Sequence, residues 1–361
     1  MDDLKQRLKE KLLRLAGADG VSGREGPVIR LLREAFGACS DRVQVDRMGN
    51  VFAYLQGGDD GPVFMICAHS DEIGALVKSV EPEGFIRFQK VGGTVDALLP
   101  ARKVSVNGKF GVVGVRAGHL LSAKERAEVK PASELYIDVG ASSAAEVAAM
   151  GIKVGDPIAF RSSIEFFEGG QRFAGKAVDN RLGCSVLWEL FQRLQGTPFA
   201  GTLVGVLAVQ EEVGLRGATV AAYRVNPEFA VALDTMPAGD TPDVSFHREL
   251  AVGIGRGPVL QLSSGHDNSR GLLLDPIMER LVTESAGEIG IPLQTALCPG
   301  NTDATAIHLV RSGIPCAPIT LPRRYSHSPV EVADLNDAAW CTLLLEAVVR
   351  KAAQARSWSF A

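Results

Sequence analysis

Residues 179–234 contain, in order, DNRLGCSVLWELFQRLQ (179–195), GTLVGVLAVQ (201–210), GLRGATVAAYRV (214–225) and EFAVALD (228–234). The first and third segments have apolar residues at helical spacing, whereas the second and fourth are short apolar runs typical of buried strands. Helices that alternate with strands in this way imply a largely parallel sheet with helices packed on it. These four segments therefore predict an α/β fold.

The same alternation continues toward both ends of the chain. Near the start, Ser22 with Glu25 three residues later matches a capping box, which predicts that these side chains open the second helix. The expected helices are 4–16, 26–37, 275–290, 303–313 and 334–354, and the expected strands are a pair over 43–55 that ends in a turn at 57–61, and then 62–69, 292–297 and 316–321.

Between residues 72 and 168 the pattern changes. Short β-rich runs such as KVSVNGKFGVVGVR (103–116) and ELYIDVG (134–140) are separated by glycine and proline, with little helical periodicity. We therefore expect one α/β domain, made of residues 1–71 and 169–361, interrupted by a small β-rich, barrel-like insert at 72–168.

Bulk composition narrows the function classes. The chain has 361 residues, of which 46% are hydrophobic, so it can bury a large core. A net charge of −4 without a dense Lys/Arg block argues against nucleic acid and anionic membranes as partners and favours a peptide or small molecule. The first residues are charged and lack the apolar stretch of a signal peptide, and no apolar run is long enough to span a bilayer. The six cysteines are scattered and form no C-x-x-C pair. We expect a cytoplasmic enzyme with reduced thiols.

His69 and Asp71 follow an apolar strand in ICAHSDEIG (66–74). Ligands in open α/β sheets gather at the carboxyl ends of strands. Since residues i and i+2 of an extended segment point to the same side, His69 can hold a metal while Asp71 accepts the other ring N–H. A polar turn without a ligand is the alternative for this short motif.

Acidic residues end the next two apolar strands. Glu211 and Glu212 are adjacent carboxylates that repel each other unless a cation or a proton offsets their charge, so they suit a free general base beside a metal ligand. Asp234 ends the strand EFAVALD at the same expected edge. A solvated loop is the alternative for the glutamate pair.

Two further residues have both a structural and a chemical interpretation. Asp179 precedes a helix, where it can be an N-cap, but its two oxygens can instead bridge two cations. His327 follows the expected strand 316–321 and is either a surface histidine or a ligand.

Taken together, these positions form a candidate metal-binding set of two imidazoles and three carboxylates. Three negative charges balance two divalent ions that share one hydroxide, and mixed nitrogen and oxygen ligation suits zinc or cobalt, with manganese as a further option. A water bridging two such ions loses a proton near neutral pH, and Glu211, outside the metal shell, would accept it. The five expected ligands are His69, Asp179, Glu212, Asp234 and His327.

Six segments resemble the M42 family of metallo-aminopeptidases, which includes glutamyl, deblocking and tetrahedral aminopeptidases. They occur in the family's order and spacing over nearly the whole chain. The segments are AHSDEIGALV (68–77), AVDNRLG (177–183), QEEVGLRGA (210–218), LDT (233–235), NTDATAI (301–307) and RRYSHSPVE (323–331).

The resemblance implies a role for each site residue. His69 and Asp234 would bind one metal, Glu212 and His327 the other, and Asp179 would bridge them. Glu211 would be the general base, and Asp71 would orient His69.

The resemblance also implies an assembly and points to local differences. Family members assemble through the β-rich insert into dimers and often hollow dodecamers that admit short peptides, so a homo-oligomer is expected. Ser70 and Asn301 stand where the family commonly has methionine and glycine, and both bear on pocket shape. Four histidines match no ligand position and are expected to be structural or surface residues: His119, His247, His266 and His308.

Three other functions fit part of this pattern. A related di-zinc carboxypeptidase or deacylase would use the same ligands with a substrate carboxylate in place of an amine. An endoglucanase-type glycosidase would use Glu211 and Glu212 as acid and base, but it would leave His69 and His327 unused, and three Trp and four Tyr provide few sugar platforms. A non-catalytic assembly protein would make Glu211 dispensable.

Overall fold

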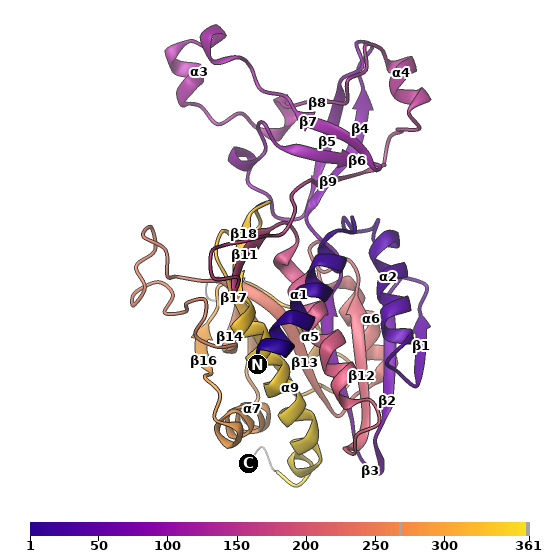
Figure 1. Cartoon of the computed structure of the whole chain (residues 1–361), viewed down its shortest axis with the longest axis vertical. Coiled ribbons are helices and arrows are strands. Elements are labelled where there is room, and N and C mark those ends of the chain that lie inside the picture. Colours follow the sequence, from indigo (N-terminus) through magenta and orange to yellow (C-terminus); the bar gives the residue numbers. More distant parts are fainter. Residues whose placement is uncertain (267–268, 359–361) are drawn as a thin grey trace.

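A mixed sheet with four parallel central strands forms the larger part of the molecule (Figure 1). The computed structural model describes residues 1–266 and 269–358. The central strands lie in the order β12 (Ala200–Ala208), β3 (Gly58–His69), β13 (Phe229–Pro237) and β17 (Cys316–Arg323), each parallel to its neighbour. The α/β class expected from residues 179–234 is confirmed.

Antiparallel strands complete the sheet on both sides of this parallel centre. On one side β2 pairs with β12 and β1, and on the other β14 pairs with β17 and β15 in antiparallel fashion and with β16 in parallel. The sheet is therefore parallel where the predicted site residues lie. The flanking strands are β1 (Arg42–Val45), β2 (Val51–Gln56), β14 (Val259–His266), β15 (Ser269–Leu273) and β16 (Gln294–Leu297).

Helices cover both faces of the sheet because successive strand side chains point to opposite faces. In β3, Phe64 and Ile66 pack into the core under five helices, whereas Met65 and Cys67 pack toward two others. None of the described helices is long and apolar enough to cross a membrane. The first face carries α1 (Asp2–Ala16), α2 (Gly26–Gly37), α5 (Val178–Leu194), α7 (Pro276–Ile289) and α9 (Leu335–Ala355), and the second carries α6 (Arg216–Val225) and α8 (Ala304–Ile307).

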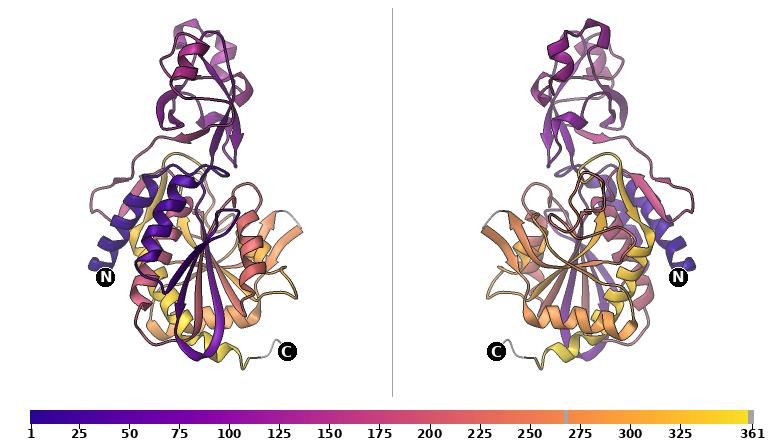
Figure 2. Two further views of the ribbon diagram at one scale, coloured as in Figure 1. Left: turned by 90° about the vertical axis from the view of Figure 1, so that its right-hand side faces the viewer. Right: turned by 90° about the vertical axis from the view of Figure 1, so that its left-hand side faces the viewer.

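The β-rich insert is a closed six-strand barrel with its own apolar core. Figures 1 and 2 show it projecting from one end of the α/β part along the long axis of the molecule. The barrel order is β4-β5-β8-β7-β6-β9, and two short helices, α3 and α4, lie in its connections. The bounds are β4 (Gly74–Val80), β5 (Ile86–Val91), β6 (Lys103–Val106), β7 (Lys109–Val113), β8 (Ile137–Asp138), β9 (Pro157–Phe160), α3 (Ala123–Ala127) and α4 (Ala144–Ala149).

A small third sheet links the end of the insert to the α/β part. Its strands are β10 (Glu165–Phe166), β11 (Arg172–Gly175) and β18 (Glu331–Asp334), paired antiparallel in that order. β18 lies directly after the segment that carries His327, so this sheet fixes the chain on one side of the predicted site.

The predicted capping box at the second helix is wrong. Glu25 is the N-cap of α2 without a side-chain capping bond, and its carboxylate accepts hydrogen bonds from the backbone N–H groups of Gly23 and Gln210. The Ser22 hydroxyl donates instead to Asp71 Oδ2 at 2.6 Å. Ser22 therefore binds the carboxylate of Asp71, which is distant in sequence, and not the first turn of α2 as the sequence pattern suggested.

Other local features also differ from what the sequence predicts. The helix expected over 303–313 is only α8, followed by turns, and the residues predicted as a turn at 57–61 fall largely within β3. Strand β14 was not predicted because buried polar residues interrupt its apolar pattern, among them Gln261 and Ser264. All six cysteines are buried as thiols, and the described residues contain no disulfide bond.

Packing between β12 and α5 leads to a stability prediction. A methyl group on Gly205 would lie 2.6 Å from the Phe191 ring, so Gly205→Ala should destabilise the chain by about 1–3 kcal/mol through overpacking. Gly287 lies in α7 with nothing within 4 Å of such a methyl group, and Gly287→Ala should raise stability by up to about 1 kcal/mol. Denaturant unfolding midpoints measure both changes. Equal midpoints for the two variants would contradict this packing.

Candidate metal centre

The predicted site residues meet at the carboxyl ends of the central strands. His69 ends β3 and pairs in register with Ala208 of β12, so Glu211 and Glu212, just beyond β12, lie beside it. Asp234 belongs to the neighbouring strand β13, and His327 follows β17. Asp179 comes from the first turn of α5, whose helix packs against β3 and β13. The chain thus brings all five expected ligands to one place.

The five side chains form two groups of three that share Asp179. In the first group, His69 Nε2 lies 3.1 Å from Asp179 Oδ1 and 3.3 Å from Asp234 Oδ1. In the second, His327 Nε2 lies 3.5 Å from Asp179 Oδ2 and 3.5 Å from Glu212 Oε2. Each residue of a group offers one ligand atom within 4.8 Å of the others. This donor set, with one carboxylate common to both groups, fits a pair of divalent cations.

The electrostatics of these groups also fit bound cations. Burial, reinforced by Asp179, raises the pKa of Glu212 to about 8, and burial raises the pKa of Asp234 as well. Burial alone would lower the pKa of His69, but the charges of Asp234 and Glu211 outweigh it and raise that pKa well above its usual value. The site therefore favours added positive charge, which protons or metal ions can supply.

Glu211 differs from its neighbour Glu212. It lines the same cleft but belongs to neither three-residue group among the described residues. Burial raises the pKa of Glu211 well above its usual value, with His69 opposing the rise and Asp234 adding to it. Its carboxylate is thus close to the two groups while remaining free to hold a proton.

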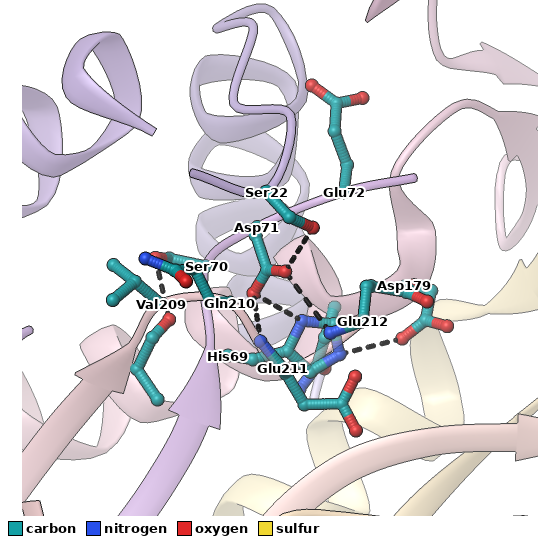
Figure 3. Close-up of polar contacts among 12 residues, drawn as sticks. Ser22, His69, Ser70, Asp71, Glu72, Asp179, Val209, Gln210, Glu211 and Glu212 are labelled. Atoms are coloured by element: carbon teal, nitrogen blue, oxygen red, sulfur yellow. Dashed lines mark hydrogen bonds and ion pairs between the residues drawn. The ribbon is translucent and has the colours of Figure 1, made fainter. Parts of the chain in front are cut away.

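Asp71 organises the strand ends around His69 (Figure 3). Its oxygens accept hydrogen bonds from the backbone N–H of Glu211 at 3.0 Å and of Glu212 at 3.2 Å. His69 Nδ1 lies 3.5 Å from Asp71 Oδ1, close enough for an ion pair but without a hydrogen bond. Asp71 therefore fixes the glutamate pair as well as facing the imidazole, and Ser22 holds its second oxygen.

The N-cap alternative for Asp179 does not hold. Its backbone is non-helical inside α5, and the neighbouring side chain of Asn180 accepts the capping bond from the N–H of Gly183. The Asp179 carboxylate faces His69 and Arg323. The backbone N–H of Asp179 donates to Glu331 Oε2 at 3.0 Å.

Two residues of the segment 323–331 were not singled out from the sequence. Glu331 accepts hydrogen bonds from the backbone N–H groups of both Asp179 and His327, and so ties two expected ligands together. Arg323 is buried, and its Nη2 donates to Asp179 Oδ2. Both lie in RRYSHSPVE, but only the folded contacts distinguish them from the other polar residues of that segment.

The groups open into a cleft of about 430 Å³. Beyond the site residues, its walls carry neutral side chains, including Met236, Gln261 and Asn301. The cleft gives an extended ligand room next to Glu211.

Three of the remaining histidines belong to neither three-residue group among the described residues. His119 and His247 are exposed, and Nδ1 of His308, the residue directly after α8, contacts the backbone oxygen of Ala304. These three fit the expected structural or surface roles. The side chain of His266 lies outside the described residues.

A contact between the insert and His327 leads to a second prediction. A methyl group on Gly93, in the loop after β5, would lie 2.6 Å from Nδ1 and 3.0 Å from Cε1 of His327. Gly93→Ala should therefore displace the ring and weaken ion binding by the second group, measured as zinc retained per chain after equilibrium dialysis. Gly118→Ala, in open space on the same insert, is the control. Unchanged zinc retention in Gly93→Ala would contradict the contact.

Comparison with known proteins identifies the family of this chain. A family model described as M42 glutamyl aminopeptidase matches residues 49–344. The lysyl aminopeptidase of Pyrococcus furiosus is 32% identical over 336 residues, covering 91% of this chain and 92% of that relative.

Two solved structures are similar to this chain over nearly its whole length. An aminopeptidase from the archaeon Desulfurococcus kamchatkensis has a TM-score of 0.91 at 34% identity, covering 96% of this chain and 95% of its own. The Pyrococcus horikoshii TET1 peptidase, which can assemble into a tetrahedron or a large octahedral shell, has a TM-score of 0.83 at 31% identity and covers 95% and 99%. The chain therefore belongs to the M42 family of glutamyl aminopeptidases.

Proposed function

We propose that this M42 peptidase removes N-terminal residues from short peptides with two divalent metal ions, zinc or cobalt, with manganese as a further option, and with Glu211 as general base. The observation that carries the proposal is the pair of three-residue groups that share Asp179, with Glu211 lining the same cleft outside both. The ligands would be His69, Asp179 and Asp234 for one ion and Asp179, Glu212 and His327 for the other.

The protein's own residues prepare the reaction. Two bound ions would supply the positive charge that polarises the scissile carbonyl and eases deprotonation of a water molecule. Glu211 would take the proton from that water and deliver it to the leaving amine, a role that suits a carboxylate whose pKa is raised by burial. Asp71 would keep His69 oriented and hold the backbone of Glu211 in place.

The charge of the cleft favours an amine over a carboxylate at the substrate terminus. A carboxypeptidase or deacylase needs a free cationic group for the substrate carboxylate. Among the described residues that line the cleft, the arginine is Arg323, and its guanidinium is already paired with Asp179 and Glu331. Glu211 and Glu212 line the same cleft, and an ammonium group beside them would favour their ionised forms.

An endoglucanase-type glycosidase is the weaker alternative. Two catalytic carboxylates would be sufficient for that chemistry, and it would leave the placement of His69 and His327 against Asp179 without a purpose. The neutral cleft wall, with Met236 and Gln261, suits a peptide side chain.

The proposal also covers the assembly of the protein and its location in the cell. We infer that residues 72–168 form an oligomerisation domain, because large apolar side chains are exposed on it, including Val115, Leu120 and Val129. A homo-oligomer between a dimer and a dodecamer would restrict access to short peptides, in line with the shell-forming TET1 relative. The cytoplasmic location stays a prediction from the sequence.

Glu211→Gln tests the general base. The variant should retain its metal while hydrolysis of aminoacyl-anilides and short peptides falls by about 100- to 10,000-fold, because the amide cannot accept the proton. Metal content by plasma mass spectrometry and kcat on the same preparation measure both effects. Glu212→Gln, the adjacent control, should lose metal as well as activity. Normal turnover in Glu211→Gln would rule out its assigned role.

His327→Ala tests the ligand assignment. The variant should retain about one ion per chain where the wild type retains about two, and should lose peptide hydrolysis with the ion. His308→Ala, a histidine outside the centre, should retain both the metal and the activity. A His327→Ala protein that still binds two ions would show that the second group is assigned wrongly.

A further inference from the structure

Arg323 places a permanent cation inside the candidate metal centre. It is the last residue of β17 and is only 3% exposed. Its Nη2 donates to Asp179 Oδ2, and its Nε donates to Thr235 Oγ1 at 2.7 Å. Its Nη1 lies 3.3 Å from Glu331 Oε1. Three contacts from three elements therefore hold the guanidinium at this position.

The guanidinium contacts only one half of the centre. The first group approaches Asp179 through Oδ1, which lies 3.1 Å from His69 Nε2. The second group approaches it through Oδ2, which lies 3.5 Å from His327 Nε2. Arg323 occupies a hydrogen-bonding position on this same Oδ2. The two groups share a residue, but only the second shares an oxygen atom with a resident cation.

The charge of Arg323 cannot be removed to admit an ion. Protons on histidine or carboxylate groups can leave when a metal binds, whereas a guanidinium stays protonated in proteins. An ion in the second group must therefore displace Nη2 from Oδ2 or bind next to it against charge repulsion. Glu331 can offset the positive charge of Arg323, but Nη2 of Arg323 still occupies Asp179 Oδ2.

We propose that Arg323 makes the two metal positions unequal, so that the His69–Asp179–Asp234 group binds its ion tightly and the Asp179–Glu212–His327 group binds its ion at least about tenfold more weakly. This inference rests on the proposed two-metal function. In the metal-free protein, Arg323 balances the negative charge of Asp179, which a second ion would otherwise balance. The chain would thus tolerate a varying occupancy of the second position.

A supporting role for Arg323 would have the opposite consequence. If the guanidinium mainly held Asp179 in position as a ligand, its removal would weaken ion binding in the second group. If it competes for Oδ2, its removal strengthens that binding. The sign of the change therefore separates the two roles.

The test is a zinc titration of chelator-stripped protein by calorimetry, with ions per chain counted after dialysis. The wild type should show two binding phases whose affinities differ at least about tenfold. Arg323→Gln should tighten the second phase by at least about tenfold while the first phase changes by less than about threefold. Arg324→Gln is the matched control, because this neighbouring arginine pairs with Asp240 away from the centre, and it should reproduce the wild-type titration.

Each other outcome overturns a defined part of the account. Two equal phases in the wild type, or a weaker second phase in Arg323→Gln, would overturn the inference and leave the two-metal proposal standing. If the folded wild type binds none of zinc, cobalt and manganese in the same titration, the proposed function is overturned and the inference with it. If Arg323→Gln does not fold, Arg323→Met keeps the apolar stem without the charge, and the same tightening of the second phase is expected from it.

Discussion

Repulsion between buried carboxylates is the constraint on which the rest of the centre depends. Asp179, Glu212 and Asp234 lie within reach of two imidazoles, with the half-buried Glu211 and the buried Asp303 nearby. Burial raises the pKa of Asp303 to about 7 and that of Glu212 to about 8, so these groups resist ionisation without a compensating cation. A chain that concentrates acids in this way needs bound positive charge to hold them ionised at neutral pH, and a peptidase can use that charge in catalysis.

The parallel centre of the sheet makes this concentration possible. Neighbouring parallel strands end at one edge, so β3, β12, β13 and β17 deliver residues distant in sequence to one place. Hydrogen bonds to Asp71 and Glu331 then fix the loops that leave the strands, because each carboxylate accepts two backbone N–H groups of site residues. The insert completes the site by placing Gly93 against His327.

The sequence predicts the parts of this structure that follow regular patterns. Alternating helices and strands in residues 179–234 indicate the parallel sheet, and the rule for strand ends correctly brings His69, Glu212 and Asp234 together. Patterns fail where a distant partner decides. Ser22 resembles a helix cap but donates to Asp71, and strand β14 buries Gln261 in place of an apolar residue. Arg323 becomes visible only through its contacts with other elements, since its neighbour Arg324 looks the same in sequence.

The central claim is that Asp179 joins two ion positions, one with His69 and Asp234 and one with Glu212 and His327. Anomalous X-ray diffraction from crystals soaked in excess zinc, with data on both sides of the zinc edge, tests it most directly. The account predicts two anomalous peaks about 3.5–4 Å apart, one on each side of the Asp179 carboxylate. A single peak, or peaks bound by other residues, would contradict it.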